Sequence, residues 1–238
     1  MFLLFDASTI ELVIYTLAAI LPGIVLLSYI YKRDSVEKEP PKLLLKLFLV
    51  GALSALLAAV LEGISDVFVL PNMSIGDNVF VQALAIGLIE EGSKLFLLYK
   101  SSWKSSSFNY CFDGVVYAVF VSLGFAVLEN ILYVFMYGLG TAVVRAITAV
   151  PGHMGFAVFM GTYYGKAKVH QVREEKDMMR HCLAVSYILA VVLHAAYDAM
   201  AMISTDLSMM LFVVFVCVMY YVVYHKIKRE SFFDTPIY

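Results

Sequence analysis

Residues 78–99 read NVFVQALAIGLIEEGSKLFLLY, a stretch with the length and apolar character of a membrane-spanning helix. Two adjacent carboxylates, Glu90 and Glu91, stand near its middle, and Lys94 follows one helical turn later. Placing a single ionised side chain near the centre of a bilayer costs roughly 2.5–3.5 kcal/mol on insertion scales. Because this stretch places several there, it predicts both a transmembrane helix and a polar site built around it.

The composition extends this prediction to the whole chain. Of the 238 residues, 62% are apolar and 15% are charged, whereas soluble domains have about 45–50% and about 25%. The apolar runs are long and continuous, which favours helices over barrel strands. We therefore predict an all-α, polytopic transmembrane helical bundle that forms a single integral-membrane domain over residues 1–238. At about 20 residues per span, the chain suits seven helices, at about 9–31, 43–62, 78–99, 112–137, 142–165, 182–204 and 207–225.

Basic residues gather in alternate connections between these spans. They follow the first, third, fifth and seventh spans, as the groups Lys32, Arg33, Lys38, Lys42 and Lys46; Lys100 and Lys104; Lys166, Lys168, Arg173, Lys176 and Arg180; and Lys226, Lys228 and Arg229. The positive-inside rule therefore places the N-terminus outside and the C-terminus in the cytoplasm. Arg145 lies near the opposite side, where interfacial placement explains it. No basic run is long enough for a nucleic-acid-binding arm, so the expected surroundings are the lipid bilayer and no nucleic acid.

Other predicted spans carry polar groups at a matching depth. Glu90, His153 and His194 fall near the middle of their helices, and Glu129 and Asp198 fall in the outer halves of theirs. These groups share a layer between the midplane of the membrane and its outer leaflet. Their coincidence in depth predicts one pocket that opens toward the outside.

The spacing of the first group indicates how its charges are arranged. Residues i and i+4 share a helix face, so Lys94 is expected to pair with Glu90, while Glu91 points about 100° away. Two carboxylates this close in a low-dielectric medium do not both ionise easily. Glu91 is thus expected to be free to accept a proton or to bind a metal. The alternative is a buried ion pair that only fixes helix packing.

Glu129 and His153 each have a functional and a structural interpretation. Glu129 either has a functional role, in which it ligates a metal or orients a water, or it is held as a neutral acid by Asn130 or a tyrosine. His153 follows Pro151, and a proline inside a transmembrane helix frees a backbone carbonyl and kinks the axis. A kink there makes room for water or substrate beside a histidine that is otherwise a packing residue.

His194 and Asp198 lie on one helix face at i and i+4. The aspartate is expected to fix the tautomer of the histidine. Alternatively, both residues face one metal or one substrate carbonyl, or the pair simply clamps two helices together. The chain contains no HExxH, GxSxG or Walker sequence. Acidic and imidazole groups without an obvious nucleophile favour water activated by a carboxylate, by a metal, or by both.

Four motifs in chain order resemble those of the PrsW intramembrane proteases, within the wider superfamily of CAAX proteases and bacteriocin-processing enzymes. The family's EExxK is similar to Glu90–Lys94, its FxxxE to Phe125–Glu129, and its two histidines to His153 in PGHMGFAVFMG and His194 in LHAAYD. The loop YKRDSVEKEPPKLLLK at residues 31–46 is also similar. One departure is Ala157, where the family pattern has glycine.

This resemblance implies a multi-pass protease of the bacterial cytoplasmic membrane. Its substrate would be a single-pass membrane protein, an anti-sigma factor cut at an extracytoplasmic site, which would start sigma-factor activation in a stress response. The expected catalytic residues are Glu90, Glu91 and Lys94; the expected metal ligands are Glu129, His153 and His194; the supporting residues are Asp198, Phe125 and Asn130. The expected cofactor is a divalent metal, zinc, with a glutamate-activated water as the metal-free alternative.

Two functions from other classes stay open at this point. A proton- or ion-coupled transporter also uses buried carboxylates and histidines as relays, although the sequence has no internal repeat and no pair of broken helices of the kind that transporters show. A non-catalytic membrane scaffold is the second alternative. It predicts that alanine is tolerated at all of these polar positions.

Overall fold

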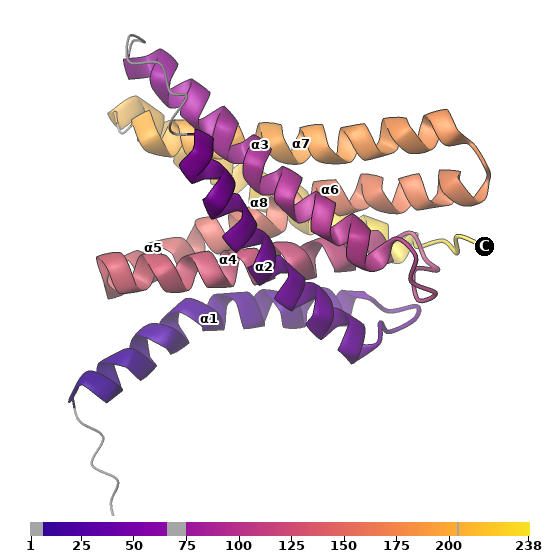
Figure 1. The fold of residues 1–238 in the computed structure, drawn as a ribbon, viewed down its shortest axis with the longest axis horizontal. Helices are drawn as coiled ribbons and strands as arrows, with labels where there is room; N and C mark the ends of the chain where they lie inside the picture. The colour runs from indigo at the N-terminus through magenta and orange to yellow at the C-terminus, as the bar shows by residue number, and fades with distance from the viewer. Residues whose placement is uncertain (1–6, 66–74, 204) are drawn as a thin grey trace, which may run out of the picture.

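The fold is an all-helical bundle, known here from a computed structural model that describes residues 7–65, 75–203 and 205–238. The described residues form eight helices and no strand, apart from one isolated bridge between Tyr110 and Pro236. In chain order the helices are α1 (Ala7–Arg33), α2 (Pro41–Ser65), α3 (Ile75–Ser102), α4 (Asp113–Tyr137), α5 (Leu139–Ile147), α6 (Ala149–Val172), α7 (Lys176–Ile203) and α8 (Asp206–Phe232). Figure 1 shows their arrangement, which confirms the predicted fold class.

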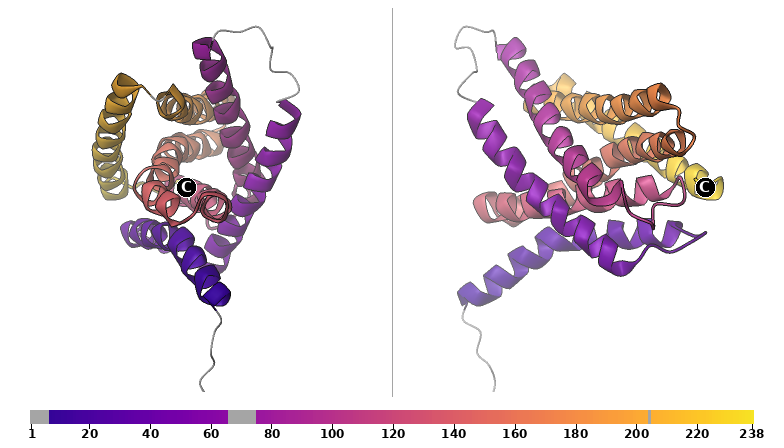
Figure 2. Two further views of the ribbon diagram at one scale, coloured as in Figure 1. Left: turned by 90° about the vertical axis from the view of Figure 1, so that its left-hand side faces the viewer. Right: turned by 45° about the vertical axis from the view of Figure 1, so that its right-hand side comes forward.

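Six of the described helical segments are long and apolar enough to cross a membrane. The exception among the predicted spans is α3, which has sufficient length with 28 residues but carries Glu90, Glu91 and Lys94 within it. α3 packs against α2 and α7, so its polar groups face helices rather than lipid alone. Figure 2 shows α1, α2, α3, α7 and α8 placed around α4 and α6, which form the centre of the bundle.

The predicted fifth span, 142–165, begins and ends differently in the structure. Its helix breaks at Thr148, so that the short α5 precedes α6. The cause is Pro151, which has no N–H to donate to the carbonyl of Ile147. The hydroxyl of Tyr220 on α8 donates to that carbonyl instead, at 2.5 Å. The freed carbonyl was predicted from the sequence, but the full break between the two helices was not.

α2 and α4 touch backbone to backbone where they cross (Figure 1). A β-carbon on Gly51 would lie 1.9 Å from the carbonyl oxygen of Val121, and one on Gly124 would lie 2.0 Å from the carbonyl oxygen of Phe48. Only glycine permits so close an approach. Beyond this crossing the two helices separate, and the space between them contributes to the cavity described below.

We expect Gly51→Ala to lower the stability of the folded bundle by about 1–3 kcal/mol, as overpacking does when the opposing atoms cannot yield. The opposing atoms here are backbone atoms of α4, which cannot rotate away. Gly63→Ala in the same helix is the matched control, because a β-carbon there meets nothing within 4 Å. Thermal unfolding in detergent measures both; equal midpoints for the two variants would contradict the tight crossing.

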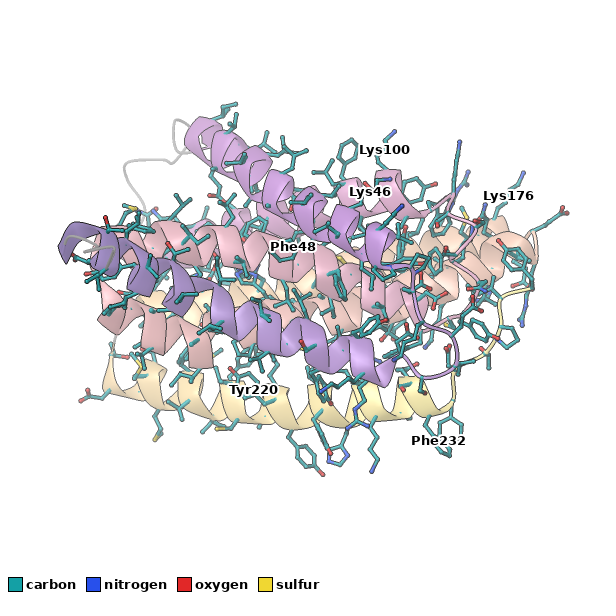
Figure 3. All side chains as sticks on the ribbon, turned by 90° about the horizontal axis from the view of Figure 1, so that it is seen from below. Lys46, Phe48, Lys100, Lys176, Tyr220 and Phe232 are labelled. Atoms are coloured by element: carbon teal, nitrogen blue, oxygen red, sulfur yellow. The ribbon has the colours of Figure 1, made fainter. Side chains whose placement is uncertain are left out.

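One end of the bundle is rich in charged residues and is closed by the chain's C-terminal segment. Figure 3 shows Lys100 and Lys176 in the half of the bundle that also holds Phe232 near the end of α8. The backbone N–H of Cys111 donates to Thr235, and that of Ile237 donates to Asn109. This segment thus ties the end of α8 to the connection between α3 and α4.

The connection between α1 and α2 buries two carboxyl groups at this end. Glu39 is 2% exposed and accepts a hydrogen bond from the hydroxyl of Tyr117 at 2.6 Å. Burial raises the pKa of Glu39 to about 7, and the neighbouring Asp34 adds to the rise. Burial likewise raises the pKa of Asp34 to about 6.

We expect Glu39→Gln to weaken the dependence of stability on pH. A carboxyl whose folded-state pKa is raised contributes stability that is present in full below its unfolded value of 4.5 and is lost as the pH rises through about 7. The wild-type melting temperature should therefore fall between pH 5 and pH 8, and fall less in the variant. The control is Glu174→Gln, at an exposed position in the connection between α6 and α7; identical slopes for Glu39→Gln and the wild type would refute this.

Candidate active site

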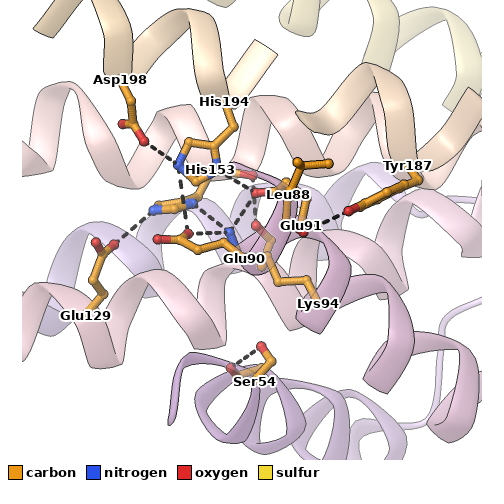
Figure 4. Close-up of polar contacts among 12 residues, drawn as sticks. Ser54, Leu88, Glu90, Glu91, Lys94, Glu129, His153, Tyr187, His194 and Asp198 are labelled. Carbon is orange, nitrogen blue, oxygen red and sulfur yellow. Dashed lines mark hydrogen bonds and ion pairs between the residues drawn. The ribbon is translucent and has the colours of Figure 1, made fainter. Parts of the chain in front are cut away.

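The bundle brings polar side chains from α3, α4, α6 and α7 to one place in its interior (Figure 4). Glu90, Glu91 and Lys94 come from α3, Glu129 from α4, His153 from α6 and His194 from α7. The exposed fraction is at most 6% for each of the three residues on α3 and for both histidines. The predicted convergence of these groups is therefore observed in the geometry.

Lys94 stands at the centre of the site. Its Nζ donates to Glu90 Oε2 at 3.1 Å and to Glu91 Oε1 at 2.7 Å. It also lies 3.1 Å from Nδ1 of His153, and 3.9 Å from the ring centre of Phe125. The expectation that Glu91 stays free of the lysine was wrong. A helix also brings residues i and i+3 together, and the long lysine side chain reaches both carboxylates.

His194 faces three carboxylates. Its Nδ1 lies 2.8 Å from Glu91 Oε1, and its Nε2 lies 3.4 Å from Asp198 Oδ2 and 3.8 Å from Glu90 Oε2. The predicted pairing with Asp198 is confirmed, but the shortest contact is with Glu91. This contact joins α7 to α3 directly, and it needed the tertiary structure to be seen.

His153 is held from its other side by Glu129. Its Nε2 lies 3.0 Å from Glu129 Oε2. The same oxygen accepts a hydrogen bond from Nη2 of Arg145 on α5 at 2.7 Å. Sequence reasoning assigned Arg145 to the membrane interface and missed this contact. The signal that would have found it is an acid and a base, each without a partner in its own helix, near the same side of the membrane.

A cavity of about 300 Å³ lies beside these groups. Its walls come from α2 to α7, and the ionisable residues that line it are Glu62, Glu90, Glu129, Arg145, His153, His194, Tyr133, Tyr197 and Asp198. Glu90 lines the cavity, whereas Glu91 is 0% exposed and is not among the lining residues. The two adjacent glutamates therefore have different surroundings, and only Glu90 meets the cavity.

The donor atoms of Glu90, Glu91, His153 and His194 lie within 4.8 Å of one another, close enough to hold a metal ion. Imidazole and carboxylate donors suit zinc and related divalent metals. In addition, Oε2 of Glu91 is buried and has no hydrogen-bond partner within the described part of the chain, as expected for an atom that binds a further ligand. The residues present thus fit a divalent metal. Glu129 lies outside this group.

The chain is similar to one protein family and to several known proteins. Residues 39–224 match the family model described as PrsW family intramembrane metalloprotease. The chain is 38% identical over 182 residues to Protease PrsW of Geobacillus kaustophilus, covering 76% of each chain. It is 38% identical over 183 residues to Protease PrsW of Bacillus subtilis, covering 76% of this chain and 79% of the relative. Protease PrsW of Clostridioides difficile is 30% identical over 219 residues, covering 90% of each. No solved structure matches the chain.

Proposed function

The chain belongs to the PrsW family of intramembrane metalloproteases. We therefore propose that it cuts a single-pass membrane regulator, an anti-sigma factor, on the outer side of a bacterial cell membrane. The proposal rests chiefly on the buried group of Glu90, Glu91, His153 and His194 beside a cavity. Ionisable side chains gathered inside an apolar membrane bundle are expensive to bury, and they typically mark a functional site. Cleavage of the regulator would release the sigma factor that it restrains.

In the proposed reaction Glu90 is the general base, because it lines the cavity and can reach a water there. It takes a proton from the water as the water oxygen attacks the carbonyl carbon of the peptide bond. The resulting carboxylic acid returns the proton to the amide nitrogen as the C–N bond breaks. Water is consumed, and the products are a new carboxyl terminus and a new amino terminus.

Lys94 prepares Glu90 for this role, and Glu91 positions His194. Lys94 compensates the charge of both carboxylates, at 3.1 and 2.7 Å. Glu91 in turn holds His194 at 2.8 Å and so fixes its ring beside the cavity. In a reaction without metal, His194 is placed to stabilise the negative oxygen that forms at the attacked carbonyl.

We further propose that His153, His194 and Glu91 hold a divalent metal, and that the metal is zinc. Two imidazoles and a carboxylate are a common catalytic zinc set. When bound, such an ion polarises the peptide carbonyl and makes a nearby water more acidic. Glu90 then remains as the base at the cavity wall.

The substrate is proposed to enter sideways from the lipid, between α2 and α4. The cavity reaches the surface past Leu56 on α2 and Leu132 on α4, which line it and are 54% and 51% exposed. Apolar side chains at such a rim suit the apolar helix of a membrane-anchored protein. The cavity lies toward one end of the bundle, and the lysine-rich connections lie at the other end. The positive-inside rule assigns the lysine-rich end to the cytoplasm and therefore the end with the cavity to the outer side.

The test is co-reconstitution of the purified chain in liposomes with a single-pass anti-sigma factor. The matched control substrate is the extracytoplasmic part of the same anti-sigma factor without its membrane helix. We expect fragments from the anchored substrate and slow or no cleavage of the free domain, since the cavity is reached through lipid. Intact substrate together with ion flux across the liposome would instead favour the transporter.

A further inference from the structure

Two nitrogens of the Arg145 guanidinium group donate hydrogen bonds to neighbouring side chains. Nη2 donates to Glu129 Oε2 at 2.7 Å, and Nε donates to Asn130 Oδ1 at 3.1 Å. The guanidinium carbon also lies 4.1 Å from the ring centre of Tyr133. The Arg145 side chain is 13% exposed and the Glu129 side chain 21%. This is a fixed, partly buried arrangement, unlike a solvent-exposed ion pair.

Asn130, which accepts the second of these hydrogen bonds, is itself held in place. Asn130 is 0% exposed, and its Nδ2 donates to the backbone carbonyl of Ala19 on α1 at 2.8 Å. With its amide nitrogen committed to Ala19, the oxygen of Asn130 is directed to Arg145. Through Asn130, the guanidinium group is therefore held in place relative to α1 and α4 independently of its contact with Glu129.

The contacts of His153 determine which of its nitrogens carries the proton. A carboxylate only accepts hydrogen bonds and an ammonium only donates them. Nε2 faces Glu129, so Nε2 carries the hydrogen; Nδ1 faces Lys94, so Nδ1 is the acceptor. Nδ1 is thus the nitrogen that is presented to the site, and its availability depends on Glu129 keeping its place.

We infer that Arg145 is a positioning residue, which holds Glu129 so that Glu129 fixes the ring and tautomer of His153. Glu129 then acts behind the histidine rather than as a metal ligand, in agreement with its place outside the metal-ligating group. Carboxylates that orient a histidine in this way are common around metal sites, and their loss typically lowers activity about 10–100-fold. The activity readout of this inference rests on the proposed protease function.

The first test is a double-mutant cycle in the liposome assay. We expect Arg145→Ala to lower the cleavage rate about 10–100-fold, with Arg145→Lys in between because an amine cannot span both acceptors. The double variant Arg145→Ala/Glu129→Ala should cleave as slowly as Glu129→Ala alone, to within about twofold. Arg180→Ala is the matched control, since the Arg180 side chain is 75% exposed. Losses that multiply would overturn the inference.

The second test does not depend on proteolysis. Nitrogen-15 spectra of the imidazole rings report which nitrogen is protonated, and His153→Gln assigns the signal. With a chelator present to keep the site free of metal, we expect Nε2 of His153 to carry the proton and Nδ1 to carry none, in the wild type and in Arg180→Ala. In Arg145→Ala we expect a mixture of both tautomers. Thermal unfolding confirms that each variant is folded. An unchanged His153 spectrum in folded Arg145→Ala would overturn the inference.

The two readouts separate failure of the inference from failure of the proposed function. If the wild type cuts no anchored substrate but the spectra change as expected, the positioning role stands and the protease assignment fails. If cleavage occurs and the His153 spectrum does not respond to Arg145→Ala, the protease assignment stands and the positioning role fails.

Discussion

Glu90→Gln is expected to lower the rate of substrate cleavage by about 10²–10⁴-fold, the range typical of a lost general base. Glutamine has the shape of glutamate but cannot accept the proton of the attacking water. Its carbonyl oxygen can still receive the hydrogen bond from Lys94, which now lies 3.1 Å from Glu90 Oε2, so the local structure should persist. Initial rates of fragment formation in liposomes, at equal amounts of folded protein, measure the effect.

The control for this variant is Glu174→Gln, an exposed glutamate in the connection between α6 and α7. It makes the same chemical change far from the cavity and should retain the wild-type rate. Glu91→Gln separates the two adjacent glutamates: it should impair the enzyme through His194 and Lys94 rather than by removing the base. A Glu90→Gln protein that cleaves at the wild-type rate would exclude Glu90 as the base.

Lys94→Met is expected to destabilise the folded protein by about 3–5 kcal/mol, as the loss of one partner of a buried ion pair does. Lys94 is 1% exposed, and its ammonium group contacts both Glu90 and Glu91. Without it, two neighbouring carboxylates remain in an apolar bundle. Methionine keeps most of the volume of the side chain, so the loss of charge and not a cavity is tested.

A compensating variant makes this second prediction specific. Lys94→Met/Glu91→Gln removes one positive and one negative charge, so it should recover a substantial part of the lost stability. Unfolding is measured in detergent with a chelator present, because a bound divalent cation would replace the missing charge. No difference in stability between Lys94→Met and the double variant would contradict an electrostatic role of Lys94.

The spans were predictable because lipid imposes a length and an apolar composition on each of them. The structure departs from the predicted spans at Thr148, where the helix breaks near the missing N–H of Pro151. The sequence indicated a freed carbonyl there, but whether the chain kinks or breaks depends on what else satisfies that carbonyl. Here the partner is Tyr220, from a distant part of the chain.

The site was predictable as a layer of groups but not as a network. Helical spacing alone brought Lys94 to Glu90 and His194 to Asp198, and both contacts are present. Spacing cannot say how helices rotate against each other, so the contact of His194 with Glu91 was missed. The contact of Arg145 with Glu129 was also missed. Arg145 lies on the short helix α5, whose position depends on the break before α6.

In the proposed mechanism, Glu90 activates water for peptide-bond hydrolysis in a pocket shared with His153 and His194. The most direct measurement is the intact mass of all species in the liposome reaction, for the wild type and for Glu90→Gln. We expect the wild type to form two fragments whose masses add up to the substrate plus one water, with no fragment attached to the protease. Glu90→Gln should form almost none. Equal fragments from Glu90→Gln, or a substrate fragment bound covalently to the protease, would contradict it.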